Sequence, residues 1–185
     1  MRVISGEKRG KKLITLQGEA VRPTTDRVKE SIFNILQFDI AGRSFLDLFA
    51  GSGQMGIEAL SRGAKKVVFV DSARESITVC KKNLENLELK ANVVNSDSLT
   101  FVKNTAETFD IAFLDPPYNK GIIEAVLPDL VKKINIGGSI VCEHAAQSTL
   151  PQQVEDFVLF KTYKYGKIML TIYRHKTMIE GGNSL

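Results

Sequence analysis

The sequence predicts an α/β fold in which a mostly parallel, seven-stranded sheet is covered by helices on both faces. From residue 44 onward, short apolar runs typical of buried strands alternate with amphipathic runs at helical spacing. Strands that are apolar along their whole length indicate a parallel sheet buried on both faces. Near the C-terminus, two strand-like runs, 157–163 and 168–174, are separated by a short turn with Gly166. This pair predicts an antiparallel hairpin that completes the sheet.

Residues 1–20, the N-terminal arm, are predicted to form a short basic β-hairpin. Val3-Ile4 and Leu13-Ile14 are its expected strands, and Arg9-Gly10 is its tip. The first twelve residues carry one acid, Glu7, against these cations: Arg2, Lys8, Arg9, Lys11 and Lys12. The arm therefore suits a polyanionic partner such as RNA. A merely solvated charged face is the alternative.

Residues 22–36 predict a helix. Pro23 opens the segment, three possible N-caps follow, and apolar side chains then recur at helical spacing. The N-cap candidates are Thr24, Thr25 and Asp26, and the apolar positions are Val28, Ile32, Ile35 and Leu36. Three cations lie near the helix start: Arg22, Arg27 and Lys29. They either meet phosphates of a substrate or pair with Asp26 and Glu30.

Four successive strands each carry an acid at or just beyond the carboxyl end. The expected strands are 44–49, 66–70, 93–94 and 109–114, and the expected helices between them are 54–62, 73–87 and one from about residue 99. The acids are Asp47, Asp71, Asp97 and Asp115. Because ligands of open α/β sheets bind at the carboxyl ends of the strands, this recurrence predicts a ligand site there.

The segment from Asp47 to Gly53 turns from the first strand into a helix, and with Gly56 it contains a G-x-G-x-x-G pattern. That pattern alone favours a dinucleotide. A carboxylate at Asp47, however, would repel a pyrophosphate and attract the cationic amino end of S-adenosylmethionine. Asp71 suits the ribose hydroxyls of either cofactor. Asp97 either accepts an adenine amino hydrogen or caps the next helix.

The segment Asp115-Pro116-Pro117-Tyr118 follows the apolar run 109–114. Two prolines remove two N–H donors, so the carbonyls of this turn have no neighbouring donors that compete for them. The carboxylate before the prolines and the ring after them complete a surface that accepts N–H hydrogen bonds and has a flat wall. This arrangement suits a planar group with an exocyclic amine, and a simple proline turn with a capping Asp is the alternative.

Beyond this turn, we expect a helix at 120–134, a turn at Gly137-Gly138 and a strand at 139–142. Glu143 and His144 are expected at the end of that strand, with His144 as a structural partner of neighbouring acids rather than a base. The C-terminal hairpin interleaves lysines with tyrosines, which suits an RNA surface or a solvated face. Residues 177–185 are expected to form a flexible tail.

The composition fits one domain rather than two, because the chain has 185 residues, of which 43% are hydrophobic. We expect the arm at 1–20, one catalytic domain at 21–176 and the tail at 177–185. The net charge of +4 is compatible with a polyanion. Cys80 and Cys142 lie far apart without metal-ligand spacing, so we expect buried, reduced thiols. No apolar run reaches membrane-span length and no signal peptide is evident, so a cytoplasmic protein without membrane contact is expected.

Several motifs together resemble one family. Asp47 to Gly53, Asp71 and Asp115 to Tyr118 are similar to those of class I S-adenosylmethionine-dependent amino methyltransferases. Arg2 to Gly6, Arg9-Gly10 and the segment 22–33 resemble more closely the RsmD type, the small-subunit rRNA guanine-N2 methyltransferases. The departure is Gln54-Met55, where small or apolar residues are expected.

The resemblance implies a Rossmann-like class I methyltransferase fold with S-adenosyl-L-methionine as cofactor. It implies methylation of N2 of the guanine at position 966 of 16S rRNA, in the small ribosomal subunit or a late assembly intermediate, by a monomer. The expected catalytic residues are Asp115, Pro116, Pro117 and Tyr118. The expected cofactor-binding residues are Asp47, Phe49, Gly51, Gly53, Asp71, Ser72, Asp97 and Ser98. The expected substrate-binding residues are Arg2, Arg9, Lys11, Arg22 and Thr24, and no metal is expected.

Three other functions remain compatible with the residues. The same chemistry could act on another amine, such as adenine N6 in nucleic acid or a glutamine side chain of a protein. The G-x-G-x-x-G pattern would also suit an NAD-dependent oxidoreductase, although Asp47 and the proline turn disfavour it. A noncatalytic RNA-binding assembly factor is the third, and the intact segment from Asp115 to Tyr118 argues against it.

Overall fold

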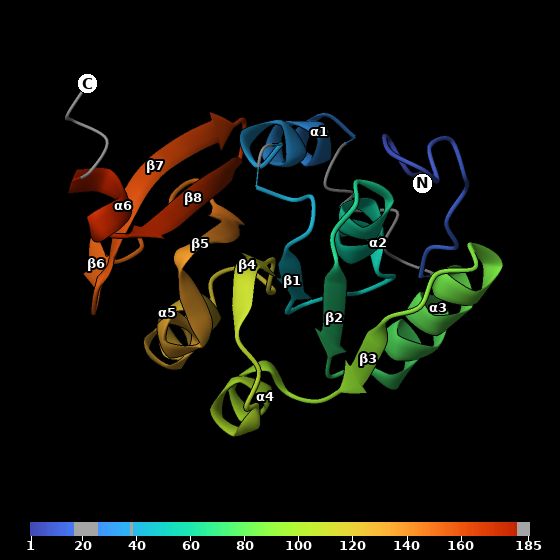
Figure 1. The fold of residues 1–185 in the computed structure, drawn as a ribbon. Coiled ribbons are helices and arrows are strands. Elements are labelled where there is room, and N and C mark those ends of the chain that lie inside the picture. The colour runs from blue at the N-terminus through green and yellow to red at the C-terminus, as the bar shows by residue number, and fades with distance from the viewer. Residues whose placement is uncertain (17–25, 38, 181–185) are drawn as a thin grey trace. The chain divides into compact units, whose positions relative to one another are not determined.

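The computed structural model describes residues 1–16, 26–37 and 39–180 of the chain (Figure 1). They form two compact units, Met1–Asp97 and Ser98–Leu185. In both units strands alternate with helices, and antiparallel strands follow near the C-terminus. The predicted α/β class is therefore confirmed.

The first unit is built on three parallel strands in the order β3-β2-β1. Their bounds are β1 Ser44–Asp47, β2 Lys66–Asp71 and β3 Asn92–Asn95, and the helices are α1 Asp26–Ile35, α2 Gln54–Ser61 and α3 Arg74–Asn86. Helix α2 packs on β1 and β2, and α3 packs on β2 and β3 (Figure 1). The central strand β2 is buried from Val67 to Val70, so burial on both faces explains its unbroken apolar run.

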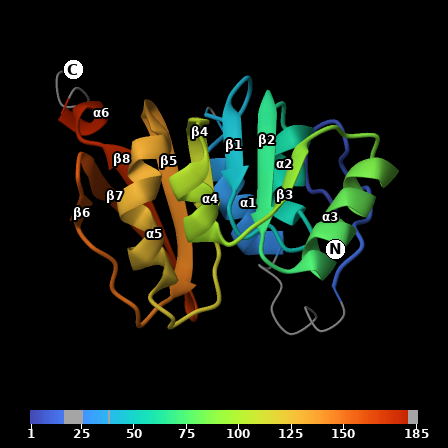
Figure 2. The same cartoon turned by 90° about the horizontal axis from the view of Figure 1, so that it is seen from below.

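The second unit pairs β4 with β5 in parallel and continues through antiparallel strands in the order β5-β8-β7-β6. Its strands are β4 Phe109–Leu114, β5 Ile134–Ala145, β6 Gln153–Val154, β7 Phe157–Tyr165 and β8 Ile168–His175. Its helices are α4 Ser98–Asn104, α5 Ile122–Leu130, the 3-10 turn η2 Val131–Lys133 and α6 Thr177–Glu180. Helix α5 runs beside β5 (Figures 1 and 2). The predicted C-terminal hairpin is confirmed as β7 and β8.

The prediction for residues 120–142 was wrong in two respects. Gly137 and Gly138 form no turn, because β5 already begins at Ile134 and runs through them. A Cβ atom at Gly138 would lie 2.5 Å from the carbonyl oxygen of Asp110, so glycine is needed here for close approach of two strands. The helix is also shorter than expected, since α5 starts after Gly121, whose φ is +63°.

The expected number of strands also needs correction. Within residues 1–16, 26–37 and 39–180, the two-residue strand β6 brings the number of strands to eight instead of the expected seven. Helix α6 occupies the first residues of the segment predicted as a flexible tail. Residues 181–185 lie outside the described residues, so the tail stays a prediction.

The described part of the N-terminal arm, residues 1–16, forms a single antiparallel bridge between Arg2 and Lys12 rather than two regular strands. One reason is that several of its backbone donors bond to residues of α2 instead of to the opposite strand. The N–H groups of Ile4 and Ser5 donate to the two carboxylate oxygens of Glu58, at 2.8 and 2.9 Å. The N–H of Glu7 donates to the carbonyl oxygen of Ser61 at 2.8 Å. The arm is therefore held on the helix by backbone hydrogen bonds.

Glu58 is also the centre of a buried charge cluster. Its side chain and that of Lys29 are fully buried, and their charged atoms lie 3.8 Å apart. Lys29 donates to the carbonyl oxygen of Arg2 at 2.8 Å, and Arg62 donates to Glu58 at 2.8 Å. Because Lys29 is fully buried, the expectation that it meets a substrate phosphate was wrong, whereas its expected pairing with Asp26 stays a prediction. Its ion pair with Glu58 joins residues that are distant in sequence.

Cys80 and Cys142 are free thiols and both are buried, as predicted. Burial raises the pKa of the Cys80 thiol to about 12, which keeps it protonated at neutral pH. Among the described residues, no helix combines the length and the apolar character needed to cross a membrane.

Glu58→Ala should loosen the arm before it affects the rest of the first unit. The substitution leaves Lys29 buried without its carboxylate, which typically costs about 3–5 kcal/mol of unfolding free energy. Amide hydrogen exchange at Ile4 and Ser5 should accelerate, because their acceptor is gone. Denaturant unfolding and exchange mass spectrometry measure the two effects.

Glu85→Ala is the matched control, because Glu85 is an exposed glutamate on α3. It should change the unfolding free energy by less than about 0.5 kcal/mol. Unchanged exchange at Ile4 and Ser5 in Glu58→Ala would contradict the anchoring role.

Candidate functional site

Three acids of the first unit lie at one edge of its parallel strands. Asp47 ends β1 and Asp71 ends β2, while Asp97 follows β3 by two residues. In the strand register, Asp47 pairs with Phe69 and Asp71 pairs with Asn95. The carboxyl ends of the three strands therefore meet at the same edge, where ligands of such sheets bind.

The loop between β1 and α2 needs its glycines for different reasons. Gly51 and Gly53 have φ values of +52° and +84°, a conformation that glycine adopts without strain. A Cβ atom at Gly53 would lie 2.7 Å from the Cys80 sulfur, and one at Gly56 would lie 2.2 Å from the Phe69 ring. Gly56 thus permits close packing of α2 on β2. Backbone conformation and close packing therefore explain the glycines of the G-x-G-x-x-G pattern, which does not by itself specify a dinucleotide.

Asp47 is 1% exposed and lies beneath this loop. Its Oδ2 accepts a hydrogen bond from the N–H of Gly56 at 2.8 Å, which ties β1 to the first turn of α2. Burial raises the pKa of Asp47 to about 7; the Gly56 hydrogen bond opposes this rise, and the negative charge of Asp71 adds to it. A cationic ligand nearby would favour the ionised form.

Asp71 is half-buried and organises the same loop from its other side. Its Oδ2 accepts from the N–H of Gly51 and its Oδ1 from the N–H of Ala73, both at 2.8 Å. Each carboxylate oxygen can accept a second hydrogen bond, so the side chain can still bind hydroxyl groups. Asp71 can therefore hold the loop and bind the ribose of a cofactor at the same time.

Asn95 contributes to this edge but was not predicted from the sequence. Its Nδ2 donates to the carbonyl oxygens of Asp71 and Ser72, at 2.9 and 3.0 Å. Asn95 thereby fixes the backbone that carries Asp71 and the exposed Ser72. A polar residue that ends β3 in register with Asp71 is the signal that could have indicated it.

The remaining predicted cofactor residues occupy the surroundings of the loop. Phe49 and Gly51 are half-buried within it, and Asp97 is exposed between β3 and α4. Ser98 is buried as the first residue of α4. Both interpretations of Asp97, as an adenine acceptor and as a helix cap, stay predictions.

In the second unit, the predicted catalytic turn directly follows β4. Asp115 is half-buried, Pro116 is buried and Pro117 is exposed. The Tyr118 hydroxyl donates to Oε1 of Glu143 at 2.9 Å, and Glu143 is 2% exposed. This bond fixes the direction of the Tyr118 ring. Sequence reasoning missed Glu143 as its partner because it placed Glu143 beyond the strand, whereas β5 continues to Ala145.

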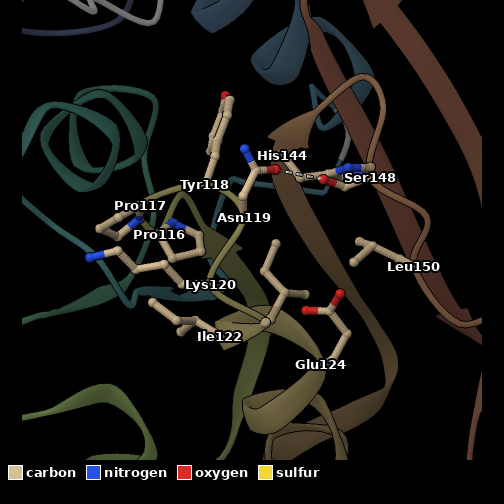
Figure 3. Close-up of a pocket in the computed structure, with 12 residues that line it drawn as sticks. Pro116, Pro117, Tyr118, Asn119, Lys120, Ile122, Glu124, His144, Ser148 and Leu150 are labelled. Carbon is tan, nitrogen blue, oxygen red and sulfur yellow. Dashed lines mark hydrogen bonds between the residues drawn. The ribbon is translucent and has the colours of Figure 1, made fainter.

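A small cavity of about 40 Å³ lies beside this turn (Figure 3). Its wall includes Pro116, Tyr118, Asn119, Glu124, His144 and Leu150. Asn119 has φ of +60° and its Oδ1 accepts from the Ser148 hydroxyl at 3.2 Å, which links the turn to the segment after β5 (Figure 3). At this volume the cavity has room for only a few water molecules, so it cannot enclose a whole purine unless side chains move.

His144 has a structural role, as expected, but with different partners. One ring nitrogen, Nδ1, lies 3.0 Å from the carbonyl oxygen of Ala145, and Nε2 lies 2.8 Å from the Thr171 hydroxyl. Burial lowers its pKa, so the ring is neutral near pH 7. Because these groups occupy both ring nitrogens, His144 is poorly suited to act as a base.

Of the predicted substrate-binding residues, Arg2, Arg9 and Lys11 lie exposed on the arm. Arg22 and Thr24 lie outside the described residues. In the C-terminal hairpin, Lys161 lies 5.2 Å from the Tyr163 ring centroid and Arg174 lies 4.9 Å from that of Phe160. Across residues 1–16, 26–37 and 39–180, no group of three His, Cys, Asp or Glu side chains is arranged to hold a metal ion.

A family model described as Conserved hypothetical protein 95 matches residues 1–174. The Bacillus subtilis protein YlbH, named for rRNA methyltransferase activity, is 42% identical over 183 residues, which cover 95% of this chain and all of that protein. Ribosomal RNA small subunit methyltransferase D of Escherichia coli K12 is 33% identical over 183 residues, covering 97% of this chain and 92% of the relative.

The fold agrees with these relatives. A solved Escherichia coli structure, described as the methyltransferase yhhF, superposes with a TM-score of 0.87 at 34% identity, covering 95% of this chain and 98% of the other. A Haemophilus influenzae methylase structure gives a TM-score of 0.80 at 35% identity, with coverages of 94% and 97%. The predicted class I methyltransferase fold and the resemblance to the RsmD type are confirmed, and the chain belongs to the Conserved hypothetical protein 95 family.

Proposed function

We propose that this protein transfers a methyl group from S-adenosylmethionine to the exocyclic N2 amine of a guanine in 16S rRNA, at position 966. The relatives named as rRNA methyltransferases, one of them as a small subunit methyltransferase, support the enzyme class and the RNA substrate. The observation that carries the choice of an amine is the turn from Asp115 to Tyr118, with its ring fixed by Glu143. The proposed partner is the small ribosomal subunit or a late assembly intermediate, and the enzyme is a cytoplasmic monomer.

The residues at the edge of the first unit fit S-adenosylmethionine, which would supply an electrophilic methyl group. Asp71 has acceptor capacity left for the ribose hydroxyls, and Ser72 is exposed beside it. The buried carboxylate of Asp47 favours the positively charged amino end over a pyrophosphate. Asp97 is an exposed acceptor suited to the adenine amine. Phe49, Gly51, Gly53 and Ser98 complete the proposed set.

The guanine amine is a weak nucleophile because its lone pair is delocalised into the ring. In the proposed mechanism, the Asp115 carboxylate and the Pro116 carbonyl accept its two N–H groups. These bonds turn the nitrogen lone pair toward the methyl carbon, so orientation is the main catalytic contribution. The amine needs no deprotonation before transfer, since the nitrogen becomes acidic only once it carries the methyl group. Asp115 or water then takes the proton.

Tyr118 is proposed to stack on the base once the nucleotide is turned out of its neighbours. Its hydroxyl bond to Glu143 holds the ring in one orientation before the base arrives. Such preorganisation lowers the entropy cost of binding a planar ligand. Because the cavity beside the turn is smaller than a purine, the base must displace side chains such as Asn119 or stack outside that cavity.

The decisive experiment is transfer of labelled methyl from S-adenosylmethionine to small ribosomal subunits that lack the modification. Naked 16S rRNA, DNA and ribosomal proteins serve as parallel substrates. Label on guanine N2 of the subunits supports the proposal. Label only on adenine N6 or on a protein glutamine would support methyl transfer to an amine but would show that the substrate is not this guanine.

Asp115→Ala should lower kcat by about 10²-fold, equivalent to about 3 kcal/mol, because it removes an acceptor that also stabilises positive charge growing on nitrogen. Cofactor affinity should stay within about twofold. Asp115→Asn keeps one acceptor oxygen, so its kcat should lie between that of Asp115→Ala and that of the unmodified enzyme. Methyl-transfer kinetics and calorimetry measure both quantities, and turnover like that of the unmodified enzyme in Asp115→Ala would refute the role.

Tyr118→Phe should reduce kcat by about tenfold, because a hydrogen bond to a carboxylate contributes about 1.5–3 kcal/mol to holding the ring. Tyr118→Ala should lose more, since base stacking contributes about another 1–3 kcal/mol. Single-turnover rates and RNA affinity separate the two losses. Equal kinetics for Tyr118→Phe and the unmodified enzyme would remove Glu143 from the mechanism.

The raised pKa of Asp47 predicts that the stability of the protein falls as the pH rises toward neutrality. Its folded pKa of about 7 exceeds the ordinary value of 3.8, so its contribution to stability is complete below about pH 4 and disappears as the pH rises through about 7. The thermal midpoint of the free protein should fall across this window. Stabilisation by S-adenosylmethionine should grow over the same range, because the cation favours the ionised carboxylate.

Asp47→Asn is the matched control, since it keeps an acceptor for Gly56 and cannot ionise. Thermal melts from pH 4 to pH 8 should show a flatter profile for this variant. Identical pH profiles in both proteins would overturn the assignment of the slope to Asp47.

A further inference from the structure

A second cavity, of about 240 Å³, lies in the first unit between the N-terminal arm and α1. It is lined by Arg2, Val3, Ile4, Arg9, Gly10 and Glu30. Its volume is near the lower limit for small-molecule sites, which suits one nucleobase with part of its sugar rather than a larger ligand. Neither the cofactor loop nor the turn at Asp115 contributes to its wall, although Arg2 and Arg9 are among the predicted substrate-binding residues.

The wall of this cavity is held in place by buried groups. The Lys29 ammonium donates to the carbonyl oxygen of Arg2 at 2.8 Å, and Lys29 is itself fully buried beside Glu58. Val3 is 1% exposed and exchanges backbone hydrogen bonds with Gly10 and Lys11. Because the backbone is fixed before a ligand arrives, binding costs little reordering of the wall.

The charged side chains at the cavity combine two cations with one carboxylate. Arg2, Arg9 and Glu30 are exposed, and within the described part of the chain none of the three side chains has an ion pair or hydrogen bond. A site for phosphate alone would not include Glu30, since the carboxylate repels the anion. A ligand that offers both phosphates and N–H donors satisfies all three groups.

Guanine is the base whose donors match a carboxylate. Its N1–H and N2–H groups lie side by side and can both be accepted by the two oxygens of Glu30. Guanidinium groups bind phosphates bidentately and stack on bases, and the apolar side chains of Val3 and Ile4 offer a surface for the ring. Such contacts need a base that is not paired, as in single-stranded RNA.

We propose that this cavity binds one guanine nucleotide of single-stranded RNA, with Glu30 accepting from the Watson–Crick edge and Arg2 and Arg9 binding the flanking phosphates. The inference rests on the proposed RNA substrate and adds a contact at which the base is held and not methylated. The bound nucleotide is thus a second recognition point in the RNA, separate from the methylated one.

Fluorescence anisotropy with labelled RNA heptamers tests the proposal on the full chain without cofactor. One heptamer is all uridine, and the other has a single central guanosine. The unmodified protein should bind the guanosine heptamer about tenfold more tightly, as a bidentate contact discriminates by about 1–3 kcal/mol. Glu30→Gln should weaken binding of the guanosine heptamer and strengthen binding of the uridine heptamer, because it removes a repulsive charge.

The decisive result is that Glu30→Gln changes the affinities for the two heptamers in opposite directions. If Glu30 is only a surface charge, Glu30→Gln will strengthen binding of both heptamers equally, and the proposal is overturned. Glu7→Gln is the matched control on the same arm and should shift both affinities by the same factor. Arg9→Ala should weaken both heptamers, because it removes a phosphate contact.

The two proposals can fail separately. Binding of guanosine at the turn near Asp115 is common to all these variants, so it cannot produce opposite signs. If the unmodified protein shows no preference for the guanosine heptamer, the cavity proposal fails. The proposed function is tested independently, by the assay of methyl transfer to ribosomal subunits. Loss of methyl transfer with the guanosine preference intact would leave the cavity as an RNA site.

Discussion

The buried carboxylate of Glu58 is the interaction on which the N-terminal arm depends. A charge in the interior is tolerated only when it is paired and hydrogen-bonded, and Glu58 has Lys29, Arg62 and two backbone N–H groups around it. The same cluster holds the carbonyl of Arg2 through Lys29. A basic segment that would otherwise be a solvated strand is thus attached to α2 with its arginines exposed. The arm therefore combines a hydrogen-bonded backbone with exposed cationic side chains.

Asn83 links this arm to the cofactor loop. Its amide exchanges two hydrogen bonds with the backbone of Ile14, at 2.8 and 2.9 Å, and donates a third to the carbonyl oxygen of Ser52 at 2.9 Å. Asn83 is 1% exposed, so these bonds form away from competing water. One buried side chain on α3 thus connects the arm to the glycine loop.

The acids at the strand ends serve structure and chemistry together. Asp47 and Asp71 each accept backbone N–H groups of the loop that they flank, so neither is simply a ligand that awaits a cofactor. Charge placed there is partly compensated by those N–H groups and remains available to a cation or to hydroxyl groups. Tyr118 and Glu143 follow the same logic in the second unit, where a buried acid orients an aromatic ring.

The strand and helix pattern, the glycine loop, the acids after the strands and the proline turn could all be predicted from the sequence, because each depends on neighbours within a few residues. Apolar runs predicted β2 and β4 almost to the residue, and the motif residues predicted the family. The partners of buried polar groups could not be predicted in this way. Lys29 with Glu58, Asn83 with Ser52 and Tyr118 with Glu143 are separated by 25 residues or more, and the tertiary structure alone brings them together. Strand β5 likewise runs through Gly137-Gly138, and Gly138 allows the carbonyl oxygen of Asp110 to approach closely. No local sequence pattern indicates that contact.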